Sequence, residues 1–211
     1  MAHVVLLGDS IFDNKSYVGA GGKDVVAHLR EAIPADWRAT LKAVDGNVTE
    51  NVSRQLSDLP ETATHLIISV GGNDALMNAD VLQMRADSAA RVLNELANRA
   101  ERFEQDYSEM LRTVLAKNLP TALCTIYFPN FPDAQTQRIA VAALATFNDA
   151  IIRQAILNNL PLLDLRLICS EKADYANPIE PSDIGGRKIA QKIFELIEKH
   201  DFSKRRTQIF A

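Results

Sequence analysis

Val4-Val5-Leu6-Leu7-Gly8-Asp9-Ser10 is an apolar run that stops at a Gly-Asp-Ser turn signal. An apolar run of strand length that ends in this way predicts a buried strand. In open α/β sheets, ligands bind just beyond the carboxyl ends of the strands. Ser10 is therefore expected to lie where nucleophiles and ligand contacts are found, although a serine here is also typical of a turn or a helix N-cap.

Segments with strand and helix patterns alternate along the chain. Strands are predicted at residues 3–7, 40–44, 65–70, 121–127 and 161–166, and helices at 23–32, 52–56, 86–98, 101–118, 135–158 and 183–199. This alternation predicts a three-layer α/β/α sandwich around a parallel sheet. Five strands in the flavodoxin-like order 2-1-3-4-5 place the carboxyl ends of the first and third strands side by side. We expect a single domain, with a core over about residues 3–199 and a solvated tail over residues 200–211.

The composition is that of an ordinary soluble protein, with 47% hydrophobic and 24% charged residues. A net charge of −4 argues against a nucleic-acid partner, because such proteins carry a clustered basic face. We find no stretch that approaches the ~20 apolar residues of a membrane span and no basic leader, so the cytoplasm is the expected location and no membrane partner is expected. Cys124 and Cys169 are expected to be free buried thiols, with a disulfide as the alternative. Oligomeric state is not predicted.

Three short motifs follow the first three predicted strands: Gly8-Asp9-Ser10, Asp45-Gly46-Asn47 and Gly71-Gly72-Asn73-Asp74. Each is also typical of a turn, and for Asp45-Gly46 alone a turn is the simpler interpretation. Together they bring a hydroxyl, glycine N–H groups and an asparagine amide to one edge of the sheet. Acyl transfer needs such a nucleophile and such donors, which stabilise the oxyanion formed on the attacked carbonyl. The sequence has no metal-ligand spacing, and no cofactor is expected.

The order and spacing of these motifs resemble the SGNH/GDSL hydrolase superfamily, esterases and lipases with a flavodoxin-like α/β fold. The resemblance extends from residue 4 to about residue 190. It implies that Ser10 is the nucleophile and that the Ser10 N–H, the Gly46 N–H and the Asn73 side chain form the oxyanion hole. Asp9, Gly72 and Asp74, which lie within the same motifs, are candidates for orienting the loops and contacting the substrate.

The last motif of the family departs from the pattern in this chain. The family has Asp-x-x-His-Pro shortly before its final helix, whereas this chain has Asn177-Pro178-Ile179-Glu180-Pro181. The alignment places Glu180 where the general base is expected and Asn177 where the aspartate that orients it is expected. The four histidines are predicted to lie far from the site, at strand starts, within a helix or after the last helix (His3, His65, His28 and His200).

Two interpretations of Glu180 remain open at this point. As a base, a carboxylate with an unperturbed pKa of ~4.3 is weak, but burial in an apolar pocket brings the pKa toward neutrality. Asn177 would then donate a hydrogen bond to it. In the other interpretation, Glu180 is a helix-entry residue that interacts with the helix N-terminal dipole.

The predicted function is hydrolysis of small esters, with short acyl or acetyl groups, through an acyl-enzyme on Ser10. The alternative is a catalytically impaired protein that keeps the oxyanion pocket and binds a small ligand, because the histidine and aspartate are replaced. A nucleotide-binding flavodoxin-like domain shares the predicted fold, but fold alone does not assign function.

Overall fold

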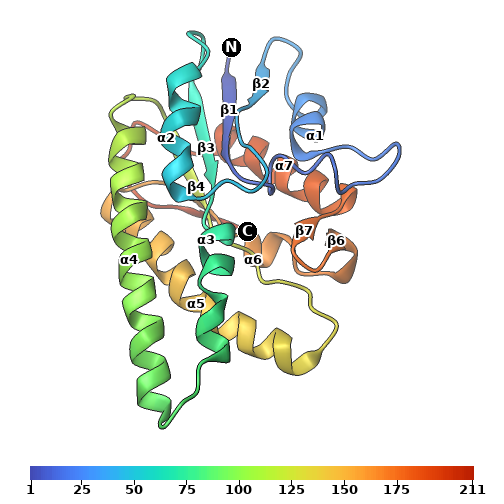
Figure 1. Cartoon of the computed structure of the whole chain (residues 1–211). Helices are drawn as coiled ribbons and strands as arrows, with labels where there is room; N and C mark the ends of the chain where they lie inside the picture. The colour runs from blue at the N-terminus through green and yellow to red at the C-terminus, as the bar shows by residue number, and fades with distance from the viewer.

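The computed structural model describes all 211 residues, and its centre is a six-stranded sheet in the order β2-β1-β3-β4-β5-β8 (Figure 1). The strands are β1 (His3–Gly8), β2 (Arg38–Leu41), β3 (His65–Ser69), β4 (Thr121–Cys124), β5 (Leu162–Leu163) and β8 (Ile209–Phe210). Every neighbouring pair in this sheet is parallel. The predicted order of the first five strands is confirmed. A separate antiparallel ribbon consists of β6 (Tyr175–Asn177) and β7 (Glu180–Pro181).

Helices cover both faces of the sheet, as predicted for a three-layer α/β fold (Figure 1). The α-helices are α1 (Val25–Ala32), α2 (Val52–Gln55), α3 (Gly72–Met77), α4 (Ala89–Leu115), α5 (Ala134–Leu157), α6 (Leu165–Ile168) and α7 (Asp183–Lys199). The 3-10 helices are η1 (Thr49–Asn51), η2 (Leu56–Asp58), η3 (Ala79–Gln83) and η4 (Lys172–Asp174). Helices α1 and α7 pack on one face of the sheet, and α4 and α5 pack on the other.

The first strand shows why the sheet is buried on both sides. Val4 and Leu6 belong to the core beneath α1 and α7, whereas Val5 and Leu7 belong to the core beneath α4 and α5. Successive side chains of a strand point to opposite faces, so an unbroken apolar run fits a strand covered twice. The interpretation of residues 4–7 as a buried central strand is confirmed.

The structure differs from the sequence-based prediction at several places: α3 and the β6–β7 ribbon were not predicted, and β2 and β4 end earlier than predicted. The predicted helices at 86–98 and 101–118 are one helix, α4, because nothing between them breaks the helix and Arg99 pairs with Glu95 one turn earlier. The predicted strand at 161–166 is only two residues long, because the Asp164 side chain caps α6 instead. The stretch 200–211, predicted as a solvated tail, ends in the sixth strand, with Phe210 buried beside β5.

This sixth strand is expected to contribute to stability. Phe210→Ala should lower the free energy of unfolding by about 2 kcal/mol, less than the ~3–5 kcal/mol of a phenylalanine at the centre of a core, because β8 is an edge strand. Phe210 is 6% exposed, whereas its neighbour Ile209 is 59% exposed. Ile209→Ala is therefore the matched control, with an expected change below about 0.5 kcal/mol. Urea unfolding measures the free energy of unfolding of both variants. Equal small changes would show that β8 contributes nothing to stability.

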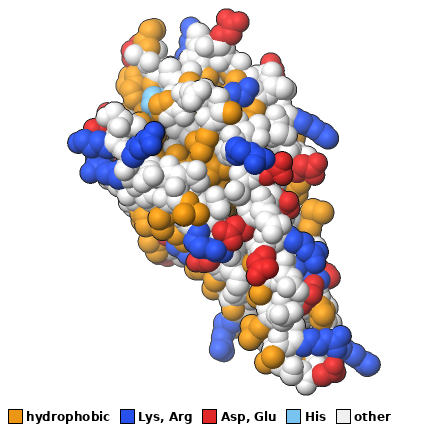
Figure 2. Space-filling model, turned by 90° about the vertical axis from the view of Figure 1, so that its left-hand side faces the viewer, with side chains coloured by type: hydrophobic (Ala, Val, Ile, Leu, Met, Phe, Trp, Pro, Cys, Tyr) orange, Lys and Arg blue, Asp and Glu red, His pale blue; other side chains and the backbone are white.

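Helix α5 has the length and apolar composition of a membrane-spanning helix, and a third of its most apolar stretch is buried inside the domain. A core helix passes the same test of length and composition, and Phe147, Ala150 and Ile151 of α5 are core residues here. Figure 2 shows the side of the molecule that lies at the left in Figure 1, with acidic and basic side chains interspersed and apolar side chains between them. Ion pairs within α4, such as Arg112–Glu109, contribute to this mixed surface.

Candidate active site

Ser10 lies in the turn directly after β1, at the carboxyl edge of the sheet. Gly8 ends the strand with a φ of 132°, and a Cβ added there would lie 1.8 Å from the carbonyl oxygen of Ser69. The close approach of β1 and β3 therefore requires glycine at this position. The side chain of Gln55 accepts a hydrogen bond from the Gly8 N–H and donates one to the Gly8 carbonyl oxygen, both 2.8 Å long. These contacts hold the end of the strand and fix the start of the turn that carries Ser10.

Glu180 reaches the same point from the ribbon that precedes α7. The Asn14 amide donates a hydrogen bond to the Pro181 carbonyl oxygen at 3.1 Å, which ties this ribbon to the loop after β1. The Ser10 hydroxyl donates to Oε1 of Glu180 at 3.0 Å, and Glu180 is only 6% exposed. Glu180 thus lies within the reach that a general base needs. Ser182 caps α7, and the Glu180 side chain, two residues before this cap, is bonded to Ser10.

The surroundings of Glu180 change its acidity. Burial, with a smaller contribution from the negative charge of Asp45, raises the pKa of Glu180 to about 7 despite the hydrogen bond from Ser10. Its second oxygen, Oε2, is buried and has no hydrogen-bond partner. A carboxylate with a pKa near neutrality is a far better proton acceptor than an ordinary glutamate and is still ionised at slightly alkaline pH.

Asn177 does not orient the Glu180 carboxylate, in contrast to the prediction. Its side-chain oxygen accepts hydrogen bonds from the N–H groups of Ile179 and Glu180, at 2.9 and 3.0 Å. Asparagine commonly closes a turn with its own following backbone in this way. The side chain is therefore engaged in shaping the turn between β6 and β7, and it positions the Glu180 backbone instead of the carboxylate.

Two of the three predicted oxyanion donors have N–H groups that the protein itself does not use. The Ser10 N–H donates no hydrogen bond within the protein. The Asn73 amide donates one hydrogen bond, to the carbonyl oxygen of Asn47 at 2.9 Å, which leaves its second N–H unused. Ser10 and Asn73 both line the same pocket. Gly46 is exposed on the loop after β2 with a φ of 79° and is not part of the pocket wall, so its role stays a prediction.

The three remaining candidates fall into two groups. Asp9 and Gly72 line the pocket with Ser10. Burial raises the pKa of Asp9 to about 8, and one of its oxygens accepts the Ile11 N–H at 3.1 Å, which closes the turn that carries Ser10. Asp74 instead accepts the Thr49 N–H at 3.1 Å and lies outside this pocket, so it secures the loop after β2.

No histidine lines the pocket. His3 and His65 each bond to a threonine hydroxyl. His28 bonds to Asp183, and His200 bonds to Gln208. Cys124 and Cys169 are free and buried. No three His, Cys, Asp or Glu side chains are arranged to hold a metal ion.

Sequence reasoning missed three residues that build the site. Asn14 ties the Glu180 ribbon to the loop after β1, and Asn148 of α5 bonds the N–H and the carbonyl of Ile126 at 2.8 Å each, which holds the loop after β4. The hydroxyl of Tyr127 donates to the carbonyl oxygen of Ile179, next to Glu180. Asn14 follows the Gly-Asp-Ser motif by four residues and was the only one with a signal in the sequence. The other two contacts join segments that only the tertiary fold brings together.

A serine hydroxyl bonded to a carboxylate, with free N–H groups in the same pocket at the carboxyl edge of a parallel sheet, is an arrangement that suits a serine hydrolase. The model of the GDSL-like lipase/acylhydrolase family matches residues 6–187. The chain therefore belongs to this family of ester hydrolases. A comparison with curated protein sequences finds no match.

Solved structures of low sequence identity share the fold. An acetyl xylan esterase, AlAXEase, is 20% identical with a TM-score of 0.68, covering 92% of this chain and 99% of its own. A member of the lipolytic G-D-S-L family from Veillonella parvula is 14% identical with a TM-score of 0.68, covering 95% of this chain and 100% of its own. The extracellular lipase of Streptomyces rimosus is 17% identical with a TM-score of 0.64, covering 92% of this chain and 99% of its own.

Proposed function

We propose that the protein hydrolyses small carboxylic esters through an acyl-enzyme on Ser10, with Glu180 in place of the histidine and aspartate usual in such sites. The observation that carries this proposal is the 3.0 Å hydrogen bond from the Ser10 hydroxyl to a buried carboxylate whose pKa is raised to about 7. Because the hydroxyl donates to this oxygen, the proton is already directed to the group that receives it.

The proposed reaction has two halves. Ser10 Oγ attacks the carbonyl carbon of the ester while its proton moves to Oε1 of Glu180. The Ser10 N–H and the free N–H of Asn73 stabilise the oxyanion, with the Gly46 N–H as a further donor. Glu180 then gives its proton to the departing alkoxide, which leaves as the alcohol. In the second half, Glu180 accepts a proton from water, the resulting hydroxide attacks the acyl carbon, and Ser10 Oγ leaves as it regains the proton.

A second candidate function is binding without turnover, in which the same pocket holds a small acyl or carboxylate ligand. The observation that favours it is that no side chain bonds Oε2 of Glu180 and that Asn177 is directed to the backbone. A base without a partner to orient it transfers protons less efficiently. The two functions differ in whether the Ser10 hydroxyl is activated.

Labelling by a fluorophosphonate separates them, because this reagent phosphonylates only an activated serine. We expect the wild type to gain one phosphonyl group by intact mass above pH 7, Ser10→Ala to gain none, and Ser57→Ala to be labelled like the wild type. Ser57 is the matched control, since its exposed hydroxyl bonds only the Arg54 carbonyl. A folded wild type that remains unlabelled between pH 6 and 9, while octanoate or acetate binds, would favour the binding function.

A further inference from the structure

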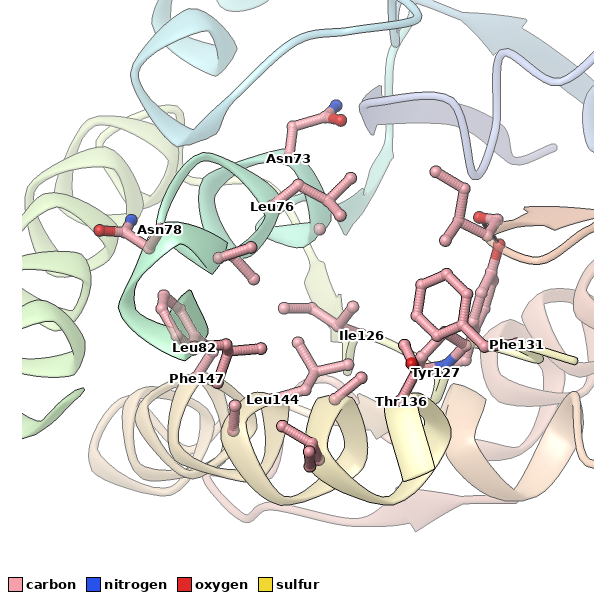
Figure 3. Close-up of a pocket in the computed structure, with 18 of the residues that line it drawn as sticks. Asn73, Leu76, Asn78, Leu82, Ile126, Tyr127, Phe131, Thr136, Leu144 and Phe147 are labelled. Carbon is pink, nitrogen blue, oxygen red and sulfur yellow. Dashed lines mark hydrogen bonds between the residues drawn. The ribbon is translucent and has the colours of Figure 1, made fainter. Parts of the chain in front are cut away.

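The pocket beside Ser10 is large and apolar (Figure 3). It has a volume of about 340 Å³, and 16 of its 25 lining residues are hydrophobic. Its only charged side chains are those of Asp9 and Glu180, one adjacent to Ser10 in sequence and the other bonded to it. The rest of the wall therefore offers no ion pair to a charged group, and an apolar substituent fits it better than a polar one.

The walls show which way a substrate extends from the reacting atoms. In Figure 3, Asn73 lies on one side of the pocket, whereas Leu144 and Phe147 of α5 lie on the opposite side, with Ile126 between them. Since Asn73 is a proposed oxyanion donor, the carbonyl carbon lies near it. An acyl chain attached to that carbon then extends across the pocket toward α5.

Apolar surface continues from the pocket to the outside. Leu76, Leu82 and Ile139 line the pocket and are 47%, 39% and 42% exposed. Large apolar side chains exposed together around a cavity are typical of a surface that is covered when a ligand binds. An acyl group would cover them, and an acetyl group is too short to do so.

The volume gives the length of the acyl chain. An engineered apolar cavity of about 150 Å³ holds benzene, with six carbons, and one water occupies about 30 Å³ of liquid. By this comparison, a space of about 340 Å³ has room for roughly 11 to 14 heavy atoms. The two ester oxygens and the first one or two carbons of the alcohol take about three or four of them, which leaves roughly eight to ten for the acyl chain. Part of this space exists because Ala140 and Ala143, on successive turns of α5, present only methyl groups to it.

We propose that this pocket binds a linear acyl chain of about eight to ten carbons, and that Ala140 and Ala143 set the upper limit. The proposal rests on the proposed esterase function and specifies its substrate as a medium-chain acyl ester, longer than the short acyl groups expected from the sequence.

Steady-state kinetics with p-nitrophenyl esters from acetate to palmitate test it. For the wild type, kcat/KM should rise up to about fourfold per added methylene, reach a maximum near octanoate or decanoate, and fall beyond it. Ala143→Phe should lower kcat/KM for octanoate at least about 10-fold and leave acetate within about twofold, with Ala140→Leu giving the same shift more weakly. Ala142→Phe, on an exposed face of the same helix, should follow the wild type.

The outcomes separate this inference from the proposed function. Turnover of acetate with no gain for longer chains, or the same chain-length profile in Ala143→Phe as in Ala142→Phe, would overturn the acyl pocket and leave the esterase intact. If no ester is turned over, the binding of octanoate, measured by calorimetry, decides whether the acyl pocket exists. Binding by the wild type that Ala143→Phe abolishes would retain the pocket without catalysis, and absence of binding would overturn it.

Discussion

Glu180→Gln is expected to lower kcat/KM for p-nitrophenyl acetate at pH 8 by about 10²- to 10⁴-fold, the range of a lost general base. Glutamine keeps the size of the side chain and can still accept the Ser10 hydrogen bond through its carbonyl oxygen. It cannot take the proton, because an amide is not a base at this pH. The loss should therefore appear in kcat. Glu198→Gln, an exposed glutamate on α7, is the matched control and should retain wild-type rates.

The pH profile provides a second readout of the same residue. With the pKa of Glu180 raised to about 7, the ionised fraction increases with pH, so wild-type kcat/KM should rise through pH 7 and level off above it. The residual rate of Glu180→Gln should lack this step. A wild-type rate that is flat between pH 6 and 8.5, or a variant that retains more than a tenth of the activity at pH 8, would contradict the assignment of Glu180 as the base.

Stability distinguishes loss of the base from loss of the fold. The folded-state pKa of Glu180 lies above its value of about 4.5 in the unfolded chain, so the unfolded state loses its proton first as the pH rises. The wild type is thus destabilised progressively between about pH 4.5 and 7, and this effect is constant above that range. Glu180→Gln escapes it and should melt at a higher temperature than the wild type at pH 8, but not at pH 4.

Most of the fold can be predicted from the sequence because its central strands are buried on both faces. The unbroken apolar runs at residues 4–7 and 66–68 have no other stable location in a protein of this size. Short edge strands lack such a signal. Ile209-Phe210 is two residues long, and only its parallel pairing with Leu162-Leu163 makes it a strand. Such a pairing depends on where the end of α7 brings the chain.

The candidate site also has a part that could be predicted from the sequence and a part that could not. Ser10 and Asn73 could be named from the sequence because motifs at strand ends are carried to one edge of the sheet. Glu180 could be named only from its register with the last motif of the family. The direction in which a side chain points could not be predicted from the sequence. Asn177 bonds two backbone N–H groups because they are two and three residues away, a local contact that competes with any contact to the carboxylate. The acyl pocket had no signal, since its wall comes from α3, η3, α5 and the loop after β4.

Asn73→Ala is expected to lower kcat for p-nitrophenyl acetate by about 10²- to 10³-fold, the cost of removing one oxyanion-hole donor. KM should change little, because the hydrogen bond strengthens only when negative charge develops on the carbonyl oxygen. The side chain has a second role, since it also bonds the carbonyl of Asn47. If Asn73 had only this structural role, Asn73→Ala would reduce thermal stability and have nearly the same kcat as the wild type.

Asn78→Ala is the matched control for this prediction. Asn78 follows α3 immediately, its amide donates to the Asp74 carbonyl at 2.8 Å, and Figure 3 shows it directed away from the pocket interior. Its removal also breaks one side-chain hydrogen bond to a backbone carbonyl, so the two variants should lose similar stability. Only Asn73→Ala should lose kcat. If both variants, or neither, fall by more than about threefold in kcat, Asn73 stabilises the loop after β2 and is not a donor to the oxyanion.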